Sequence, residues 1–359
     1  MTSPAAATGP TDATVPAETP VPAFRLTDST LRDGSHAVRH QYTEQQVTDI
    51  VTGLDQAGVA VLEVSHGDGL GGSSFNYGFS GTDESKLVAA AVAAATNAKI
   101  ACLLIPGIGT LDDLRAIADL GVSVARIATH CTEADIAEQH IGMAKQLGLE
   151  AVGFLMMAHM IEPDQLLEQA KLMQGYGADL VYCVDSAGAM TTPMARARIE
   201  MLTAELDIGV GMHSHENLSL SVANSLAALE AGAVHVDCCT TGAGAGAGNC
   251  PTETFVAVCE KLGIETGVDT LAVMDVAEDI VRPAMQRPQI VDRAALILGY
   301  AGVYGSFMLH SERAAQRYGV SQAEILLELG RRKVVGGQED MIIDVALELA
   351  ERAGKAAKS

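Results

Sequence analysis

The sequence predicts an α/β fold, a (β/α)8 TIM barrel followed by a helical C-terminal extension. From Phe24 onward, short β-rich apolar runs alternate with amphipathic helical stretches, and eight such units can be counted at about thirty residues each. Eight equal units are typical of a closed parallel barrel. An open doubly wound sheet is the alternative, but it would not naturally use eight equal units. After Leu262 the pattern changes to helix upon helix.

The predicted strands are apolar runs bounded by turn residues: 24–28, 59–64, 100–105, 124–128, 151–156, 180–184, 209–212 and 234–237. The predicted helices of the barrel have apolar residues at helical spacing, and several precede a glycine suited to a C-terminal cap: 44–57, 111–120, 133–147, 163–176, 193–206, 217–231 and 250–262. Further helices are expected at 272–281, 292–300, 312–318, 322–331 and 339–349.

These elements divide the chain into three parts. Residues 1–23 are mostly Ala, Pro and Thr, which cannot bury enough surface to offset the entropy of ordering, so we predict a disordered tail. Residues 24–268 are expected to form the catalytic barrel. Residues 269–359 are expected to form the helical extension, which would cap the site and contact a partner.

Composition excludes several classes of protein. A formal net charge of −22 leaves no basic surface for nucleic acid. No apolar run approaches the roughly 20 residues of a membrane-spanning helix. The first residues also lack the charged segment followed by an apolar segment that is typical of a secretory signal. The seven cysteines form no CxxC pair, which favours reduced thiols. We therefore expect a cytoplasmic protein that binds neither nucleic acid nor membrane.

Polar residues gather where the first predicted strand ends. Arg32, Asp33 and His36 follow it within a few positions. In a parallel barrel the chemistry lies on the loops after the strands, so a carboxylate, a guanidinium and an imidazole at this point suggest a site. A surface Arg–Asp pair beside an exposed histidine is the alternative explanation.

The seventh predicted strand leads into His213 and His215. Residues two apart on a strand share a face, so both imidazoles point the same way. The first strand of a closed barrel lies only one strand from the seventh, which allows Asp33 to converge on the pair. One carboxylate and two imidazoles leave open positions on an octahedral ion, and this suits Mn²⁺, Co²⁺, Mg²⁺ or Fe²⁺ better than a closed zinc site.

The segment after the eighth predicted strand, residues 240–249, consists mainly of Gly, Ala and Thr. Small residues allow the backbone to approach a ligand closely, so the segment could be a phosphate cradle or merely a flexible linker. No Lys-Ser/Thr pair follows it, which argues against a nucleotide P-loop.

The stretch Thr30–His36 together with the His213/His215 pair resembles the metal-dependent lyase and synthase superfamily of TIM barrels. Further stretches resemble its 4-hydroxy-2-oxovalerate aldolase family: 66–70, 72–78, 104–109, 128–133, 153–157 and 299–304. The similarity runs from about Phe24 to the C-terminal helices. Each stretch alone is weak evidence for the family, but the combination is highly specific for it. Glu216 departs from the further histidine that many members carry after the metal pair.

The resemblance implies a role for each matching residue. Asp33, His213 and His215 would bind a divalent metal, most naturally Mn²⁺, with Co²⁺ or Mg²⁺ as alternatives. Arg32 would stabilise an enolate and His36 would transfer protons. Tyr304 would position the substrate, which would also contact Arg32, Ser186 and His213. Asn249 would support the metal ligands.

The resemblance also implies an activity and a partner. The activity is cleavage of 4-hydroxy-2-oxo acids to pyruvate and a short aldehyde such as acetaldehyde, in the degradation of aromatic or related compounds. The implied partner is a CoA-acylating acetaldehyde dehydrogenase that receives the aldehyde directly. An acyl-CoA-dependent Claisen synthase or lyase, or a non-catalytic barrel scaffold, are the alternatives. No imine-forming lysine is expected, since Lys99 precedes a predicted strand and Lys145 lies on a predicted helix.

Overall fold

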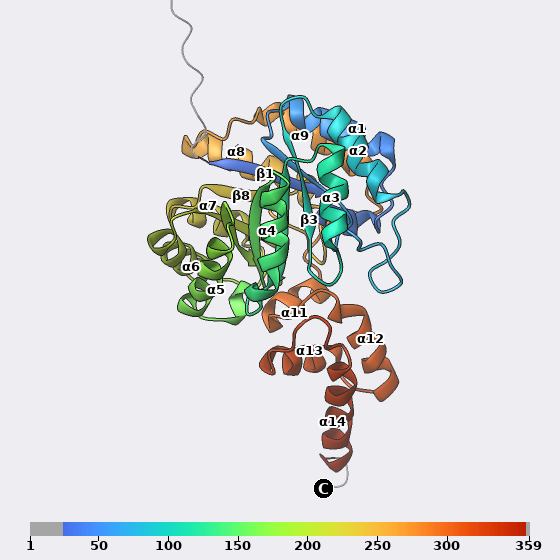
Figure 1. The fold of residues 1–359 in the computed structure, drawn as a ribbon. Coiled ribbons are helices and arrows are strands. Elements are labelled where there is room, and N and C mark those ends of the chain that lie inside the picture. The colour runs from blue at the N-terminus through green and yellow to red at the C-terminus, as the bar shows by residue number, and fades with distance from the viewer. Residues whose placement is uncertain (1–23, 357–359) are drawn as a thin grey trace, which may run out of the picture.

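A computed structural model describes residues 24–356, with the side chains of residues 24–354, so the predicted disordered tail lies outside the described residues. Eight parallel strands form a closed barrel in sequence order, with helices around it and further helices beyond one end (Figure 1). The strands are β1 Arg25–Leu31, β2 Val61–Val64, β3 Lys99–Leu104, β4 Val124–His130, β5 Glu150–Met156, β6 Leu180–Asp185, β7 Gly209–Ser214 and β8 His235–Cys238. The predicted TIM barrel is confirmed.

Strand register brings three polar segments to the same end of the barrel. In β1, Thr27 pairs with Val61 of β2 on one side and with Asp237 of β8 on the other. Asp237 also pairs with His213 of β7. Since all strands are parallel, the loops after β1, β7 and β8 emerge together.

The helices around the barrel are α1 Glu44–Gln56, α2 Glu84–Ala94, α3 Leu111–Leu120, α4 Glu138–Gln146, α5 Pro163–Gly175, α6 Thr192–Glu205, α7 Ser221–Glu230 and α8 Thr252–Leu262. Capping boxes that favour helix initiation precede α1 at Thr43, α3 at Thr110 and α5 at Glu162. Helix α2 was not among the predicted helices. Its sequence is alanine-rich, so it lacks the contrast between an apolar and a polar face on which the prediction depends.

The C-terminal part contains α9 Thr270–Asp275, which continues through a π-helical turn at Val276–Val281 into α10 Arg282–Ala284, and then α11 Arg293–Ala301, α12 Phe307–Tyr318, α13 Gln322–Arg331 and α14 Met341–Ala356. Helices α11 to α14 lie below the barrel in Figure 1, with α14 farthest away. The five predicted helices are found here in order: the first corresponds to α9 and the π-helical turn, and the others correspond to α11–α14. Helix α12 begins five residues before its predicted start.

Three clusters of buried apolar side chains hold the molecule together. The largest lies between the strands and the surrounding helices, and it includes Val273 and Val281 of the C-terminal part. A second fills the barrel interior and includes Phe154 and Tyr182. Gly211 leaves room for the second of these rings, because a Cβ there would lie 2.7 Å from it. The third cluster belongs to α11–α14 and the segments that join them.

Polar contacts fasten the extension to the barrel loops. The side chain of Asn217 donates to the carbonyl of Ala295 at 2.9 Å. The His159 ring lies 3.1 Å from the carbonyl of Gly302, through its Nε2 atom. These bonds fix α11 over the carboxyl ends of the strands.

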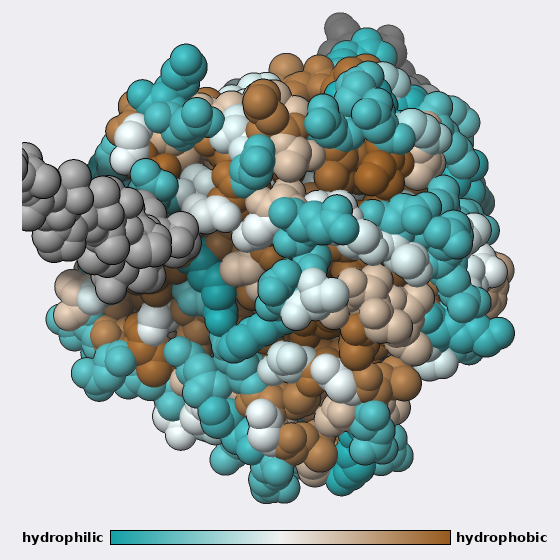
Figure 2. Space-filling model, turned by 90° about the horizontal axis from the view of Figure 1, so that it is seen from above, coloured by the Kyte–Doolittle hydropathy of each residue, from teal (hydrophilic) through white to brown (hydrophobic). Residues whose placement is uncertain are grey.

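The end of the barrel away from α14 has hydrophobic and hydrophilic residues interspersed over its surface (Figure 2). All seven cysteines are buried and unpaired, as the sequence predicted. Among residues 24–356, no helix combines the length and apolar character needed to cross a membrane.

Candidate metal centre and active site

A cavity of about 700 Å³ lies at the carboxyl ends of the strands. Residues from the barrel loops and from the extension line it together. Those that the sequence singled out are Arg32, Asp33, His36, Ser186, His213, His215 and Tyr304. The structure therefore brings seven of the eight predicted site residues to one cavity, and Asn249 lies directly behind Asp33.

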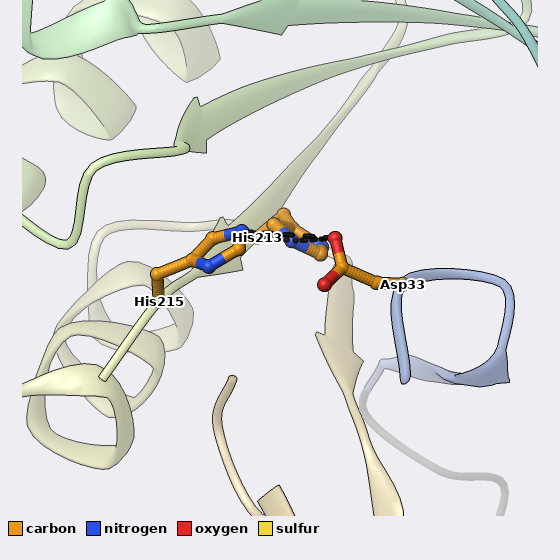
Figure 3. A group of neighbouring side chains, drawn as sticks. All are labelled: Asp33, His213 and His215. Carbon is orange, nitrogen blue, oxygen red and sulfur yellow. Dashed lines mark hydrogen bonds and ion pairs between the residues drawn. The ribbon is translucent and has the colours of Figure 1, made fainter. Parts of the chain in front are cut away.

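Asp33, His213 and His215 form a triangle of ligand atoms at the base of this cavity. The Nε2 atoms of the two histidines are 3.2 Å apart, and they lie 3.8 and 3.7 Å from Oδ2 of Asp33. Figure 3 shows the three side chains pointing toward one another from the end of β7 and from the loop after β1. Edges of this length match an ion bound at about 2.1 Å from each atom.

The hydrogen bonds of these residues leave their lone pairs free to bind a divalent cation. Nδ1 of His213 lies 2.8 Å from Oδ2 of Asp237, so this nitrogen carries the proton and Nε2 presents a lone pair. That lone pair faces a second imidazole and a carboxylate, in a place where all three residues are buried. A cation placed between these three electron-rich atoms would stabilise their convergence in a buried site.

Charged neighbours tune the carboxylate of Asp33. Burial opposes its ionisation, but the Arg32 guanidinium and the imidazoles of His215 and His213 hold its pKa well below the usual range. Its Oδ1 accepts hydrogen bonds from the side chain of Asn249 at 2.9 Å and from the backbone of Ala245 at 3.2 Å. The carboxylate is therefore ionised and held in place.

Burial lowers the pKa of His215 to about 4, although the carboxylate of Asp33 opposes this shift. At neutral pH the imidazole is consequently uncharged, which is the form that binds a metal.

Arg32 lies beside the triangle with one donor free. Its Nη1 donates to Asp33 at 2.7 Å and its Nε donates to Glu63 at 2.8 Å. Its Nη2 is buried and has no hydrogen-bond partner within the described residues. A fixed guanidinium with an unused donor is suited to an oxyanion in the cavity.

His36 faces the cavity as part of a histidine cluster. Its ring packs edge-to-face on His40 at 4.8 Å, and His40 stacks on His66 at 3.8 Å between centroids. A Cβ at Gly67 would lie 2.5 Å from Nε2 of His36, so a larger residue in this loop after β2 would displace the His36 ring from its present position. Burial and the neighbouring imidazoles of His36 and His66 lower the pKa of His40 to about 3, so this ring is a neutral support.

Tyr304 comes from the extension, in the segment between α11 and α12, and lines the cavity with Tyr77 and Asp68. Burial and then the charges of Asp68 and Asp33 raise its pKa, so the hydroxyl remains protonated. Ser186 follows β6, and its Oγ accepts a hydrogen bond from the backbone of Met157 at 3.0 Å.

The structure adds three charged residues that the sequence analysis missed: Glu63, Arg126 and Asp237, which are all buried in the barrel interior. Glu63 pairs with Arg32 and with Arg126, each at 2.8 Å. Arg126 also pairs with Asp237. Burial opposes the ionisation of Asp237, but Arg126 and His213 lower its pKa to about 2. The sequence offered one signal for these residues, since each is a charged residue within a predicted strand.

The glycine-rich segment after β8 packs against Asp33, one of the candidate metal ligands. Ala245 and Asn249 both donate to Asp33, and Gln289 of the extension donates to the carbonyl of Gly244 at 2.7 Å. This segment thus supports the ligands rather than serving only as a linker. Glu216, the departure from the family pattern, accepts hydrogen bonds from the backbone and side chain of Ser221 at the start of α7.

The comparisons with known proteins show the family to which the chain belongs. The HMGL-like family model matches residues 23–280. A 4-hydroxy-2-oxovalerate aldolase of Carboxydothermus hydrogenoformans is 59% identical over 91% of this chain and 97% of its own length. The chain belongs to the 4-hydroxy-2-oxovalerate aldolase family. Another 4-hydroxy-2-oxovalerate aldolase, of Chloroflexus aggregans, is 58% identical over 92% of this chain and 96% of its own.

Further similarities concern the extension and the fold. Residues 289–351 match the DmpG-like communication domain. Among solved structures, the N-terminal domain of a putative aldolase from Bacteroides vulgatus is similar with a TM-score of 0.68, at 22% identity over 79% of this chain and 94% of its own. The carboxyl transferase domain of Rhizobium etli pyruvate carboxylase, in a structure with pyruvate, has a TM-score of 0.75 at 15% identity, over 93% of this chain and 62% of its own. At these identities the solved structures support the fold alone.

Proposed function

We propose that this chain cleaves 4-hydroxy-2-oxovalerate to pyruvate and acetaldehyde, using a divalent metal, most naturally Mn²⁺, at Asp33, His213 and His215. The observation that carries the proposal is the ligand triangle beside the unused Nη2 donor of Arg32, both at one cavity. The high identity to named aldolases over nearly the whole chain supports the choice of substrate.

The reaction requires a place for the electron pair of the broken C3–C4 bond. When bound, the metal supplies Lewis-acid polarisation of the C2 carbonyl. Arg32 directs a permanent positive charge toward the same oxygen, and its Nη2 donates a hydrogen bond to it as negative charge develops. Ser186 lines the cavity nearby and is assigned to substrate binding.

His36 takes the proton of the C4 hydroxyl. As the C3–C4 bond breaks, C4 becomes the aldehyde carbon, and the electron pair forms the enolate of pyruvate between C3 and C2. The proton held by His36 then returns to C3 and completes pyruvate, so no other reactant is consumed. Tyr304, reaching in from the extension with a protonated hydroxyl, orients the C4 hydroxyl toward His36.

Other classes of function are less well supported. An imine-forming aldolase requires a lysine in the cavity, and no lysine lines this cavity within the described residues. A Claisen synthase of the same superfamily is not favoured by the names of the relatives, which are aldolases. A non-catalytic scaffold would have no need to bury the charges of Arg32 and Asp33 beside two histidines.

The extension leads us to propose a partner, a CoA-acylating acetaldehyde dehydrogenase that takes the aldehyde directly. The match of residues 289–351 to a communication domain supports this assignment. Exposed apolar residues on these helices, such as Tyr300, Leu309 and Leu347, offer surface for contact. The buried, unpaired cysteines fit a reducing compartment, and we propose the cytoplasm, with a role in the degradation of aromatic or related compounds.

Pyruvate release measured with lactate dehydrogenase tests the proposed activity. The chain with Mn²⁺ should release pyruvate from 4-hydroxy-2-oxovalerate, and borohydride added with substrate should leave it active. His36→Asn should lose most of the activity, whereas His140→Asn, on the far side of the barrel wall in α4, should retain it. Inactivation by borohydride, or full activity in His36→Asn, would refute the assigned chemistry.

The partnership has its own test. The chain should co-purify with the dehydrogenase, and an external aldehyde-trapping enzyme should intercept little acetaldehyde during coupled turnover. If the two proteins never co-elute and the trap collects most of the aldehyde, the proposed partnership is wrong.

A further inference from the structure

Arg126 is a fully buried arginine in the middle of β4, at 2% exposure. Its guanidinium lies between two aromatic rings, 4.5 Å from the centroid of Phe154 and 4.6 Å from that of Tyr182. It is not among the residues that line the cavity. The charge of Arg126 therefore faces other protein groups rather than the cavity.

The guanidinium joins two carboxylates that belong to opposite sides of the candidate site. Nη1 lies 2.8 Å from Oε2 of Glu63, which also accepts a hydrogen bond from Nε of Arg32. Nη2 donates to Oδ2 of Asp237, the oxygen that faces Nδ1 of His213 at 2.8 Å. The Arg126 guanidinium thus connects Glu63, which binds Arg32, with Asp237, which binds His213.

The contact between Asp237 and His213 determines which ring nitrogen is free. A carboxylate at Nδ1 keeps the proton there, so Nε2 presents its lone pair toward His215 and Asp33. A carboxylate partner also makes the imidazole a stronger electron donor to a metal. Without it the ring could adopt the other tautomer and turn an N–H toward the place of the ion.

We infer that Asp237 is a positioning residue for the metal ligand His213 and that Arg126 holds Asp237 in place for this purpose. The inference rests on the proposed role of His213 as a ligand. A purely structural role for this arrangement is a weaker explanation, because burying an arginine and two carboxylates costs free energy that apolar side chains of similar volume would not.

Mn²⁺ affinity of the purified full chain, measured by electron paramagnetic resonance of the free ion, tests the inference independently of turnover. Asp237→Asn should bind Mn²⁺ about 10- to 100-fold more weakly than the wild type, which is the usual effect of losing a carboxylate behind a ligand histidine. Glu150→Gln is the matched control, since Glu150 is an acid paired with Arg25 and Lys99 near the start of β5. It should bind Mn²⁺ within twofold of the wild type.

A folded Asp237→Asn variant with wild-type Mn²⁺ affinity would overturn the inference. Arg126→Lys is the second variant, because a single ammonium group keeps the charge but cannot span both carboxylates. It should weaken Mn²⁺ binding by an intermediate factor. An unchanged affinity in this variant would show that Arg126 does not hold Asp237 for metal binding.

The wild type provides a test that needs no folded variant of Asp237. In the metal-free chain labelled with ¹⁵N-histidine, the His213 signals should show a proton on Nδ1 and none on Nε2, with His213→Gln used for assignment. The opposite tautomer would overturn the inference. If the wild type itself does not bind Mn²⁺, the proposed metal function fails instead, so the two failures are distinguishable.

Discussion

The guanidinium of Arg32 lies 2.7 Å from the carboxylate of Asp33, the residue that directly follows it. Both side chains are buried at the same end of the barrel, and Arg32 adopts φ −116° and ψ −81° at the start of the 3-10 turn that contains Asp33. The carboxylate that we propose as a metal ligand and a permanent cation therefore adjoin one place in the cavity. A substrate oxygen there would meet positive charge from two sides.

Substitution of Arg32 tests the value of this arrangement. Arg32→Lys keeps the charge but loses the planar fork that reaches Glu63, Asp33 and the substrate together, so kcat should fall on the order of a hundredfold or more. Steady-state kinetics would measure this, with Arg115→Lys as the control at an exposed arginine of α3. A near-normal kcat would reassign Arg32 to a structural pair.

Tyr304→Phe should affect the choice of stereoisomer more than the rate. If the Tyr304 hydroxyl orients the C4 hydroxyl of the substrate, its loss should let both C4 isomers bind in reactive poses. The ratio of kcat/KM between the two isomers should then fall by a larger factor than kcat for the preferred isomer. Cleavage of the separate isomers would measure this. Tyr300→Phe is the control, since Tyr300 is 72% exposed on α11. Equal losses for both isomers would refute the orienting role.

Glu150 should contribute stability that depends on pH. Burial opposes its ionisation, but the side chains of Arg25 and Lys99 lower its pKa to about 2. Because the pKa is lower in the folded state, the contribution is complete above the unfolded value of roughly 4.3 and is lost as the pH falls toward 2.

Glu150→Gln should therefore lower the free energy of unfolding by about 1–2 kcal/mol at pH 7, after allowance for solvent screening of this partly exposed carboxylate. Urea unfolding at several pH values would measure the difference. It should shrink between pH 4 and pH 2, and a difference that is constant with pH would contradict the ion-pair explanation.

Much of the fold and part of the site could be predicted from the sequence. Eight apolar runs at regular spacing specify a closed barrel, and polar residues just after a strand are placed at one end of it by the fold itself. For this reason Asp33, His213 and His215, although about 180 residues apart in the chain, could be expected to converge, as the structure shows they do.

The supporting charges could not be predicted in the same way. Glu63, Arg126 and Asp237 lie within strands, where a period of two says only that each side chain points inward or outward. Their pairing depends on the barrel's register and on the length of each side chain, neither of which has a local signal. The placement of Tyr304 over the cavity likewise depends on contacts such as that between His159 and Gly302, which join separate parts of the chain.

Metal dependence of pyruvate release from 4-hydroxy-2-oxovalerate is the most direct test of the proposed function. The chain should be treated with a chelator, freed of it by dialysis, and assayed before and after addition of Mn²⁺ or Co²⁺, with Asp33→Asn carried through the same steps. We expect activity to fall to background without metal, to return with either ion in the wild type, and to remain low in Asp33→Asn. Undiminished pyruvate release by the metal-free wild type would contradict the proposed mechanism.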